Sequence, residues 1–301
     1  MNIAITGGNG SIGSHISKMI KELGHKVIFI SRIKKNKCDN FYSFDDLFSF
    51  RINCDLDCFI HLASPNYDYA RDNSLEDGIV HLTSNILKVL NKYNCRKFIY
   101  FSSAKVYGEP SLTQKNIFNE DSLPNPVSDY GKQKLKAEKI IITQANKLNI
   151  DYIIYRMPLV YGASNISNIN KLLRYIEKSY PFFMFNNTYH LKKSLISIEN
   201  IKLYIKYNIQ NTNTIKKNVF NITDKSSISL NELIIKKKKS SNSKSFIINL
   251  PYFILRILVM IPCLGKDVLK IYGHFEISNK NITNAYKIEC HDTYNHIFDI
   301  N

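Results

Sequence analysis

The sequence predicts an α/β fold with a doubly wound parallel sheet, followed by a smaller α/β lobe. A glycine-rich turn follows the first apolar segment, and short apolar runs then alternate with helical stretches as far as Gly162. Such alternation produces parallel sheets, because each helix carries the chain back to the start of the next strand. We expect residues 1–162 to form the sheet domain and residues 163–301 the smaller lobe. A later strand near residues 219–222 is expected to return to the sheet.

Composition excludes several classes of protein. The chain has 301 residues, of which 44% are hydrophobic, so it can bury a large core and is not disordered. Its net charge is +16, yet only seven of the 41 basic residues are arginine, which leaves 34 lysines spread along the chain. Proteins that read nucleic acids tend to cluster arginine. We therefore expect no nucleic-acid partner, although a basic surface would attract a phosphorylated substrate.

The cysteines and the N-terminus predict a cytoplasmic protein. None of the cysteines forms a CxxC pair or a zinc-like Cys/His cluster, so we expect free thiols and no metal site. They are Cys38, Cys54, Cys58, Cys95, Cys263 and Cys290. The chain opens directly into an apolar strand, which predicts no signal peptide.

One apolar run, Phe246–Leu264, has to be weighed as a membrane segment. Asn249, Pro251, Arg256 and Pro262 interrupt it, so it falls short of the ~20 apolar residues of a membrane span. We expect a packed helix in the second lobe and no stable membrane insertion, with peripheral membrane contact as a minor alternative.

A dinucleotide site is predicted at the start of the chain. Residues 2–6 form a short strand, Gly7, Gly10 and Gly13 follow at GxxGxxG spacing, and a helix runs on to about Leu23. Glycines at this spacing allow a tight turn, close approach of the backbone to a pyrophosphate, and packing of helix on strand. The phosphates would lie at the N-terminus of the helix.

The end of the second strand favours NADP. This strand, Lys26–Ile30, ends in Ser31 and Arg32, with Lys34 and Lys35 just beyond. NAD-specific sites usually place a carboxylate here for the adenosine ribose, whereas a hydroxyl and cations suit a 2′-phosphate. We therefore expect NADP(H), with NAD(H) as the open alternative.

Further strands are expected at residues 58–61, 97–101 and 151–155. Ligands of doubly wound sheets lie at the carboxyl ends of the strands. Ala63, Ser103 and Pro158 follow these ends and should line the same crevice as the glycine turn. His61 is more typical of a packed core histidine than of a catalyst.

The pair Tyr130 and Lys134 predicts the chemistry. The segment 129–147 has a helical pattern, and residues four apart lie on one helix face. An ammonium beside a phenol favours the phenolate, so we expect a lowered Tyr130 pKa that permits proton transfer near neutral pH. The pair alone is a weak signal, but it follows the glycine turn and the segment 101–108 in a characteristic order.

Taken together, these motifs resemble the extended short-chain dehydrogenase/reductases that act on nucleotide sugars, the NAD-dependent epimerase/dehydratase family. The resemblance covers nearly the whole chain. It rests on Gly7-x-x-Gly10-x-x-Gly13, His61-Leu-Ala-Ser64, Ser102-Ser103-x-x-Val106-Tyr107-Gly108, Tyr130-x-x-x-Lys134 and Arg156-x-Pro158-Leu-Val-Tyr-Gly162, with weaker matches over 193–200 and 220–224. It implies a Rossmann domain and a nucleotide-sugar lobe.

The resemblance also implies roles for individual residues. Tyr130 would be the general acid/base, Lys134 would hold the nicotinamide ribose and lower the Tyr130 pKa, and Ser103 would hydrogen-bond the same sugar oxygen. The implied cofactor contacts are Gly7, Gly10, Ser11, Ile12, Gly13, Ser31, Arg32, Leu62, Ala63, Ser102, Tyr130, Lys134, Pro158 and Val160. The implied substrate contacts are Ser64, Ser103, Lys105, Leu159 and Lys193.

Departures from the family pattern bear on the reaction. Ala104 and Lys105 stand where 4,6-dehydratases carry Asp-Glu, which argues against a dehydratase. Leu159 stands where 4-epimerases and many relatives carry asparagine. Lys193 stands where the family usually has an arginine for the diphosphate, and lysine cannot form the forked contact.

Three functions stay open. The first is NADPH-dependent reduction of a UDP-4-keto-6-deoxy (amino) sugar in bacterial surface-polysaccharide biosynthesis, which Ser31, Arg32 and Leu159 favour. The second is a UDP-hexose or UDP-N-acetylhexosamine 4-epimerase that retains NAD. A distant third is a non-catalytic NAD(P) sensor, which the presence of Ser103, Tyr130 and Lys134 disfavours. The family resemblance further implies a homodimer.

Overall fold

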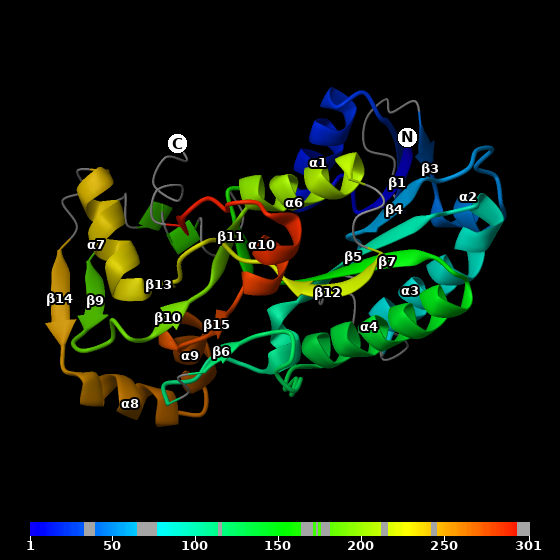
Figure 1. Cartoon of the computed structure of the whole chain (residues 1–301). Helices are drawn as coiled ribbons and strands as arrows, with labels where there is room; N and C mark the ends of the chain where they lie inside the picture. Colours follow the sequence, from blue (N-terminus) through cyan, green and yellow to red (C-terminus); the bar gives the residue numbers. More distant parts are fainter. Residues whose placement is uncertain are drawn as a thin grey trace. The chain divides into compact units, whose positions relative to one another are not determined.

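The computed structural model describes residues 1–32, 40–64, 77–113, 116–163, 171–172, 174–175, 181–211, 216–241 and 246–293. The chain divides into two compact units (Figure 1). Unit 1 comprises Met1–Val106, Pro124–Arg156 and Lys202–Phe220. Unit 2 comprises Tyr107–Leu123, Met157–Ile201 and Asn221–Asn301.

A seven-stranded sheet in the order β12-β7-β5-β4-β1-β2-β3 is the centre of the fold. Its strands are β1 (Asn2–Thr6), β2 (Lys26–Ile30), β3 (Phe41–Tyr42), β4 (Cys58–His61), β5 (Lys97–Ser103), β7 (Asp151–Met157) and β12 (Lys217–Asn221). Neighbouring strands from β3 to β5 run parallel. Because β1 lies between β2 and β4, the chain winds outward in both directions from the centre, as predicted for a doubly wound, Rossmann-like sheet.

Helices cover both faces of this sheet. They are α1 (Ser11–Glu22), α2 (Phe44–Phe48), α3 (Gly78–Leu90), α4 (Asp129–Lys147) and α6 (Ile198–Gln210), with 3₁₀ turns at Asn91–Tyr93 and Ala104–Tyr107. Figure 1 shows α3 and α4 on one face and α1 with α6 on the other. The buried faces of α3 and α4 join the apolar side chains of β4, β5 and β7 in one core cluster. Burial of these faces drives the packing of helix on sheet.

Unit 2 contains short, mostly two-stranded pairings. They are β8 (Leu159–Tyr161) with β11 (Leu195–Ser197), β9 (Phe182–Phe185) with β14 (Ile247–Leu250), β10 (Lys192–Lys193) with β13 (Ile228–Ser229), and β6 (Ile117–Phe118) with β15 (Glu276–Ile277). Its helices are α7 (Leu230–Ser240), α8 (Tyr252–Met260), α9 (Gly265–Tyr272) and α10 (Lys280–Tyr286).

The buried carboxylate of Asp224 holds several segments of unit 2 together. It accepts hydrogen bonds from the Tyr161 hydroxyl at 2.6 Å, the Ser197 amide at 2.9 Å, the Asn200 side chain at 2.6 Å and the Thr293 hydroxyl at 2.9 Å. A buried charge is tolerated only when its oxygens are satisfied in this way. The two weak sequence matches, over 193–200 and 220–224, thus meet at one structural centre.

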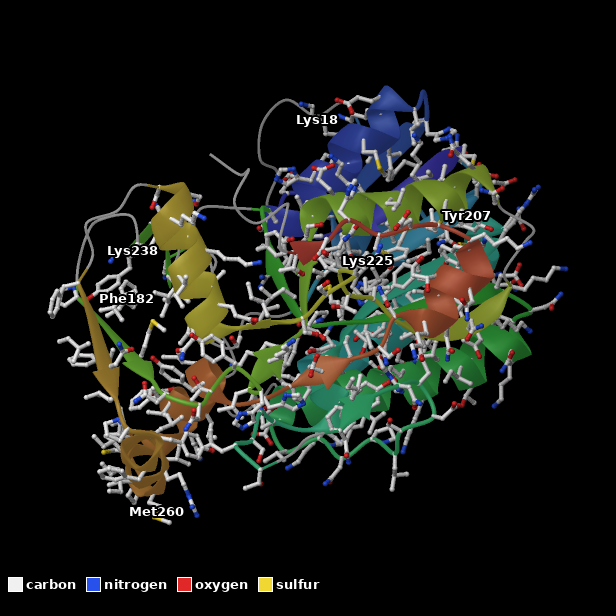
Figure 2. The ribbon with its side chains drawn as sticks, turned by 60° about the vertical axis from the view of Figure 1, so that its left-hand side comes forward. Lys18, Phe182, Tyr207, Lys225, Lys238 and Met260 are labelled. Carbon is white, nitrogen blue, oxygen red and sulfur yellow. The ribbon has the colours of Figure 1, made fainter. Side chains whose placement is uncertain are left out.

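The apolar run Phe246–Leu264 departs from the packed helix that we expected. It forms strand β14, then α8 after Pro251, and then a turn into α9. Leu255 is the buried residue of α8, and several other apolar side chains of the helix are exposed. Figure 2 shows Met260 at the outer end of α8, pointing away from β9 and β14. Among the described residues, no helix has the length and apolar character to cross a bilayer.

Candidate active site

The glycine turn between β1 and α1 is built for close approach of a phosphate. Gly7 has φ +70°, and a Cβ added to Gly13 would lie 2.1 Å from the Gly7 carbonyl oxygen. Gly10 caps α1 without a side-chain hydrogen bond, and the first turn of the helix carries no acidic residue. The first amide N–H groups of α1, at Ser11, Ile12 and Gly13, therefore have no acceptor from the cap, as anion binding requires. This cradle fits a dinucleotide.

The loop after β4 lies beside the glycine turn. A Cβ on Gly7 would lie 3.0 Å from the Ala63 nitrogen, and the Ala63 amide donates to the Thr6 hydroxyl at 3.2 Å. The structure thus brings Leu62 and Ala63 to the predicted cofactor turn. The neighbouring Ser64 hydroxyl is buried, and no described residue offers it a hydrogen-bond partner. A buried hydroxyl of this kind is suited to a ligand contact.

His61 is a core residue, as the sequence suggested. It is 1% exposed, its Nδ1 lies 2.7 Å from the Thr6 hydroxyl and its Nε2 lies 3.2 Å from the Thr83 hydroxyl. Burial lowers its pKa to about 3, and the Lys134 charge adds to this effect. His61 is therefore neutral, and it fixes the position of β4 relative to β1.

The end of β2 places Ser31 and Arg32 where the sequence suggested contacts with the adenosine ribose. The Ser31 amide donates to the Tyr42 carbonyl at 3.1 Å, which ties this end to β3. Ser31 is half-buried and Arg32 is exposed. The other cations of this prediction, Lys34 and Lys35, lie outside the described residues.

The catalytic candidates come together where α4 begins beside the end of β5. The Ser103 side chain acts to lower the pKa of Tyr130, and its hydroxyl accepts the Lys105 amide at 3.2 Å. The helix approaches closely because residue 131 is glycine: a Cβ there would lie 2.6 Å from the Lys105 carbonyl oxygen. Ser128 caps the helix by accepting the Gly131 amide at 3.4 Å. We had assigned no role to Gly131, although its position next to Tyr130 was a signal.

The pKa of Tyr130 differs from our expectation. Burial raises it to about 12, against the lowering effect of the Ser103 hydrogen bond. We had expected the Lys134 ammonium to lower this pKa. The Lys134 amine instead donates to the Phe101 carbonyl at 2.8 Å and lies 5.7 Å from the centre of the Tyr130 ring. In the protein alone, loss of water therefore outweighs the effect of the lysine.

Lys134 is buried, and its burial disfavours the protonated form of the amine. It is 2% exposed, and its Nζ lies 4.6 Å from the centre of the Tyr100 ring. Burial lowers its pKa to about 7, while the Glu138 carboxylate acts to raise it. The protonation of this amine is therefore sensitive to an additional group near it, such as a cofactor hydroxyl or phosphate.

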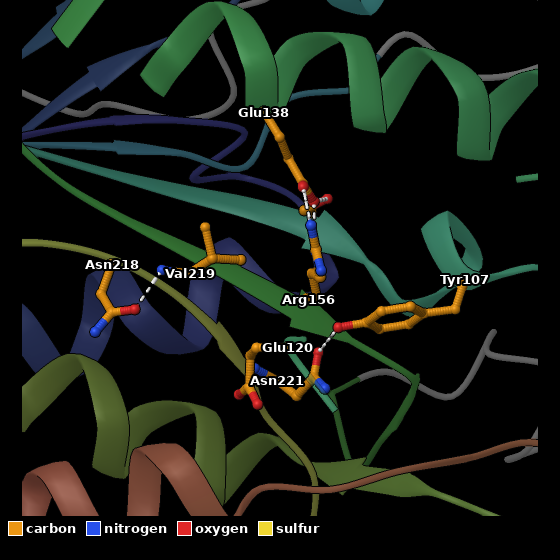
Figure 3. Close-up of polar contacts among 8 residues, drawn as sticks. Tyr107, Glu120, Glu138, Arg156, Asn218, Val219 and Asn221 are labelled. Atoms are coloured by element: carbon orange, nitrogen blue, oxygen red, sulfur yellow. Dashed lines mark hydrogen bonds and ion pairs between the residues drawn. The ribbon is translucent and has the colours of Figure 1, made fainter. Parts of the chain in front are cut away.

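A buried ion pair anchors α4 one turn after Lys134. Arg156 on β7 donates to the Glu138 carboxylate through Nε at 3.1 Å and through Nη2 at 2.7 Å (Figure 3). The Ser102 hydroxyl also donates to Glu138, so its side chain is engaged and only its backbone is left for the predicted cofactor contact. Sequence reasoning missed Glu138, although its spacing of four from Lys134 places it on the same helix face.

The remaining predicted residues lie in unit 2. Leu159 begins β8 and is 51% exposed, with Pro158 and Val160 on either side. Lys193 ends β10, where its amine donates to the Lys270 carbonyl, and burial lowers its pKa to about 7. To bind an anion, the Lys193 amine would have to give up its hydrogen bond to the Lys270 carbonyl.

Within unit 1, the geometry is suited to proton transfer beside a dinucleotide. Ser103 at the end of β5 and Tyr130 on α4 lie near the buried Lys134 amine, which is 5.7 Å from the centre of the Tyr130 ring. The glycine turn and the loop after β4 lie next to each other at the ends of β1 and β4. This combination serves oxidation or reduction at a carbon–oxygen bond.

A family model matches most of the chain. The family model described as the NAD dependent epimerase/dehydratase family matches residues 3–219. The match includes β1 to β7, the glycine turn and the whole of α4.

Individual relatives match part of the chain. The N-acetyl-α-D-glucosaminyl-diphospho-ditrans,octacis-undecaprenol 4-epimerase of Escherichia coli O157:H7 is 30% identical over 199 residues, which are 65% of this chain and 58% of that protein. The UDP-glucose 4-epimerase of Vibrio cholerae is 34% identical over 119 residues, 40% of this chain and 36% of that protein. The matched part of the chain therefore spans little more than half the length of the first relative and about a third of the second.

Solved structures share the fold over the whole chain. The UDP-glucuronic acid 4-epimerase of Bacillus cereus, solved in complex with NAD, superposes with a TM-score of 0.76. The alignment covers 100% of this chain and 94% of that one at 19% sequence identity. At this identity, the likeness describes the fold.

Proposed function

The chain belongs to the NAD-dependent epimerase/dehydratase family, and on that premise we propose that it is a 4-epimerase of a sugar carried on a diphosphate. The observation that carries this proposal is the placement of Tyr130 and Lys134 one turn apart on α4, with the Ser103 side chain acting on the Tyr130 hydroxyl, in the unit that also contains the glycine turn. The names of the relatives support the epimerase over the 4-keto reductase that we favoured from the sequence.

The proposed roles follow from the chemistry of each group. The glycine turn and the loop after β4 would hold NAD, and the chemistry that this cofactor would supply is reversible hydride transfer at the sugar C4. Tyr130 would take the proton of the 4-hydroxyl as the ketone forms and give it back when the hydride returns. Ser103 would donate a hydrogen bond to the same oxygen, and Lys134 would hold the cofactor ribose. The cofactor's positive charge would oppose the rise in the Tyr130 pKa that burial causes.

The carrier of the sugar is part of the proposal. UDP is one candidate, and the Escherichia coli relative is named for a sugar joined through a diphosphate to undecaprenol. Both carriers present the same diphosphate, for which Lys193 is the candidate contact. Ser64, Lys105 and Leu159 would contact the sugar, Pro158 and Val160 the cofactor, and residues 163–301 would carry most substrate contacts. A homodimer is likewise proposed.

A second candidate is supported by the end of β2. Ser31 and Arg32 replace the carboxylate that usually accompanies NAD, which suits NADPH and net reduction of a 4-keto sugar. The two candidates differ in their cofactor balance. An epimerase retains its cofactor and consumes none, whereas a reductase oxidises one NADPH per product.

The deciding experiment is nucleotide analysis of the purified protein followed by product analysis. We expect NAD to be retained, and proton NMR to show C4 epimers of UDP-N-acetylglucosamine or of its polyprenyl diphosphate counterpart without NADPH consumption. Protein that arrives without nucleotide and oxidises NADPH with a 4-keto sugar would replace the epimerase by the reductase.

A further inference from the structure

Helix α8 exposes an apolar face. Its inner side packs through Leu255, which is fully buried in a cluster with Phe185, Leu191 and Val268. Its outer side carries Phe253, Ile257 and Met260 at helical spacing, and these side chains are 60%, 54% and 77% exposed. A surface helix normally places polar residues on its outer side, whereas α8 is apolar on both.

Apolar side chains are also exposed in the turn that follows α8 and on α9. Ile261 and Leu264 are 37% and 40% exposed, and Ile271 on α9 is 49% exposed. The turn is tight, because the Gly265 amide donates to the Ile261 carbonyl at 2.7 Å and a Cβ on Gly265 would lie 2.0 Å from the Val259 carbonyl oxygen. We call the exposed set Phe253, Arg256, Ile257, Met260, Ile261, Leu264 and Ile271 the α8–α9 surface. Helices α8 and α9 pack against each other, and Figure 2 shows Met260 of this set at the end of α8.

The charges around this surface are mostly basic. Between Phe246 and Gly273 the chain has three basic residues against one acidic residue, a net charge of +2. Arg256 lies on the exposed side of α8, and Lys266 is exposed at the start of α9. Asp267 bonds Lys270 at 2.8 Å, and Glu109 also acts on Lys270. No carboxylate occurs from Phe246 to Lys266 to oppose an anionic partner.

Length decides between crossing a bilayer and lying on it. The nine residues of α8 span about 14 Å, less than half of the roughly 30 Å hydrocarbon core. A short helix with an apolar face and basic neighbours lies in the interface, with its apolar side chains at the headgroup boundary. Anionic headgroups then attract the arginine and lysine.

We propose that the α8–α9 surface docks this protein on an anionic lipid bilayer. Phe253, Ile257, Met260 and Leu264 would enter the headgroup–acyl boundary, with Arg256 and Lys266 at the phosphates. Docking would raise the local concentration of a substrate whose diphosphate is joined to a lipid. That use rests on the proposed function, whereas the docking itself does not.

The composition of the chain offers a sharp test, because it contains no tryptophan. Phe253→Trp in the 301-residue chain places a single tryptophan on the surface, and Leu123→Trp places one at an 86% exposed site elsewhere in unit 2. Both are titrated with vesicles of equal parts phosphatidylglycerol and phosphatidylcholine. We expect a blue shift and quenching by brominated acyl chains for Phe253→Trp alone. An unchanged spectrum at both positions would overturn the proposal.

Sedimentation with the same vesicles measures the contribution of the apolar side chains. We expect Phe253→Gln/Met260→Gln to lower the bound fraction at least about ten-fold, and the matched pair Leu123→Gln/Val127→Gln to leave it unchanged. Pure phosphatidylcholine should bind the wild-type protein more weakly. Equal binding of the two double variants would contradict docking through this surface.

Other occupants of the surface would give different results. A wild-type dimer that Phe253→Gln/Met260→Gln converts to monomer, without vesicle binding by either, would assign the surface to a second copy of the chain. Epimerisation of the sugar on UDP and on polyprenyl diphosphate, each in solution without vesicles, is measured separately. If the protein binds vesicles but epimerises no substrate, the proposed function is wrong and the docking proposal stands. If it epimerises the substrate but binds no vesicles, the docking proposal is wrong and the proposed function stands.

Discussion

Helices α4 and α8 depart from the usual polar pattern in opposite directions. The 19-residue α4 buries Lys134 and Glu138, which are 2% and 1% exposed. The nine-residue α8 exposes Phe253 and Met260. Buried charge has a free-energy cost unless it is paired, and exposed apolar surface favours association. Such departures tend to mark function, and we read α4 as the chemical element and α8 as the docking element.

The largest effect is expected from the α4 side of this comparison. Tyr130→Phe removes the hydroxyl proposed as the acid/base, and we expect epimerase activity to fall by about 10²–10⁴-fold because proton transfer is lost. The activity assay is C4 epimerisation followed by NMR. Retained NAD and an unchanged melting temperature are the controls. Activity within ten-fold of wild type would reassign the acid/base role.

Glu138→Gln measures how much the buried Glu138–Arg156 ion pair contributes to stability. It removes the carboxylate charge that the buried Arg156 guanidinium contacts at 2.7 Å, and we expect the free energy of unfolding to fall by about 3 kcal/mol. Asp129→Asn on the same helix is the control, since the Asp129–Lys132 pair is exposed and should contribute less than about 0.5 kcal/mol. Urea denaturation compares the two. Equal losses would show that burial adds nothing to the Glu138–Arg156 pair.

The pH dependence of stability should follow Lys134. Its folded pKa of about 7 lies below its usual value of 10.5, so the unfolded chain binds more protons between these pH values. Stability should therefore rise with pH above 7, by no more than about 1.4 kcal/mol per pH unit for each such lysine. Lys193 acts with the same sign. Urea midpoints against pH should flatten in part for Lys134→Met and further for Lys134→Met/Lys193→Met. A slope unchanged in Lys134→Met would refute the shift.

The smallest effect is expected on the outer face of α8. Met260→Gln should change the free energy of unfolding by less than about 0.5 kcal/mol, because the side chain is 77% exposed. Leu255→Ala on the inner face should lower it by about 2–5 kcal/mol. Thermal and urea unfolding of both variants provide the contrast. A large loss for Met260→Gln would mean that the outer face belongs to the fold and not to a partner.

Much of unit 1 could be predicted from local patterns. β1, β2, α4 and β4 occur at the residues that hydrophobic periodicity and the glycines indicated. Tyr130 and Lys134 were identified because helical spacing alone places them together. The role of Glu138 could have been read from the same spacing, whereas its partner Arg156 lies on β7 and no local pattern pairs the two.

What the sequence by itself determined is the order of elements, the glycine cradle and the family. These depend on backbone conformation and on spacing within single elements, which are local properties. Only the tertiary structure decided the direction of the Tyr130 pKa shift, the engagement of Ser102 by Glu138, and the exposure of the outer face of α8. Each of these depends on how much water the surrounding elements exclude, and burial is a property of the packed molecule.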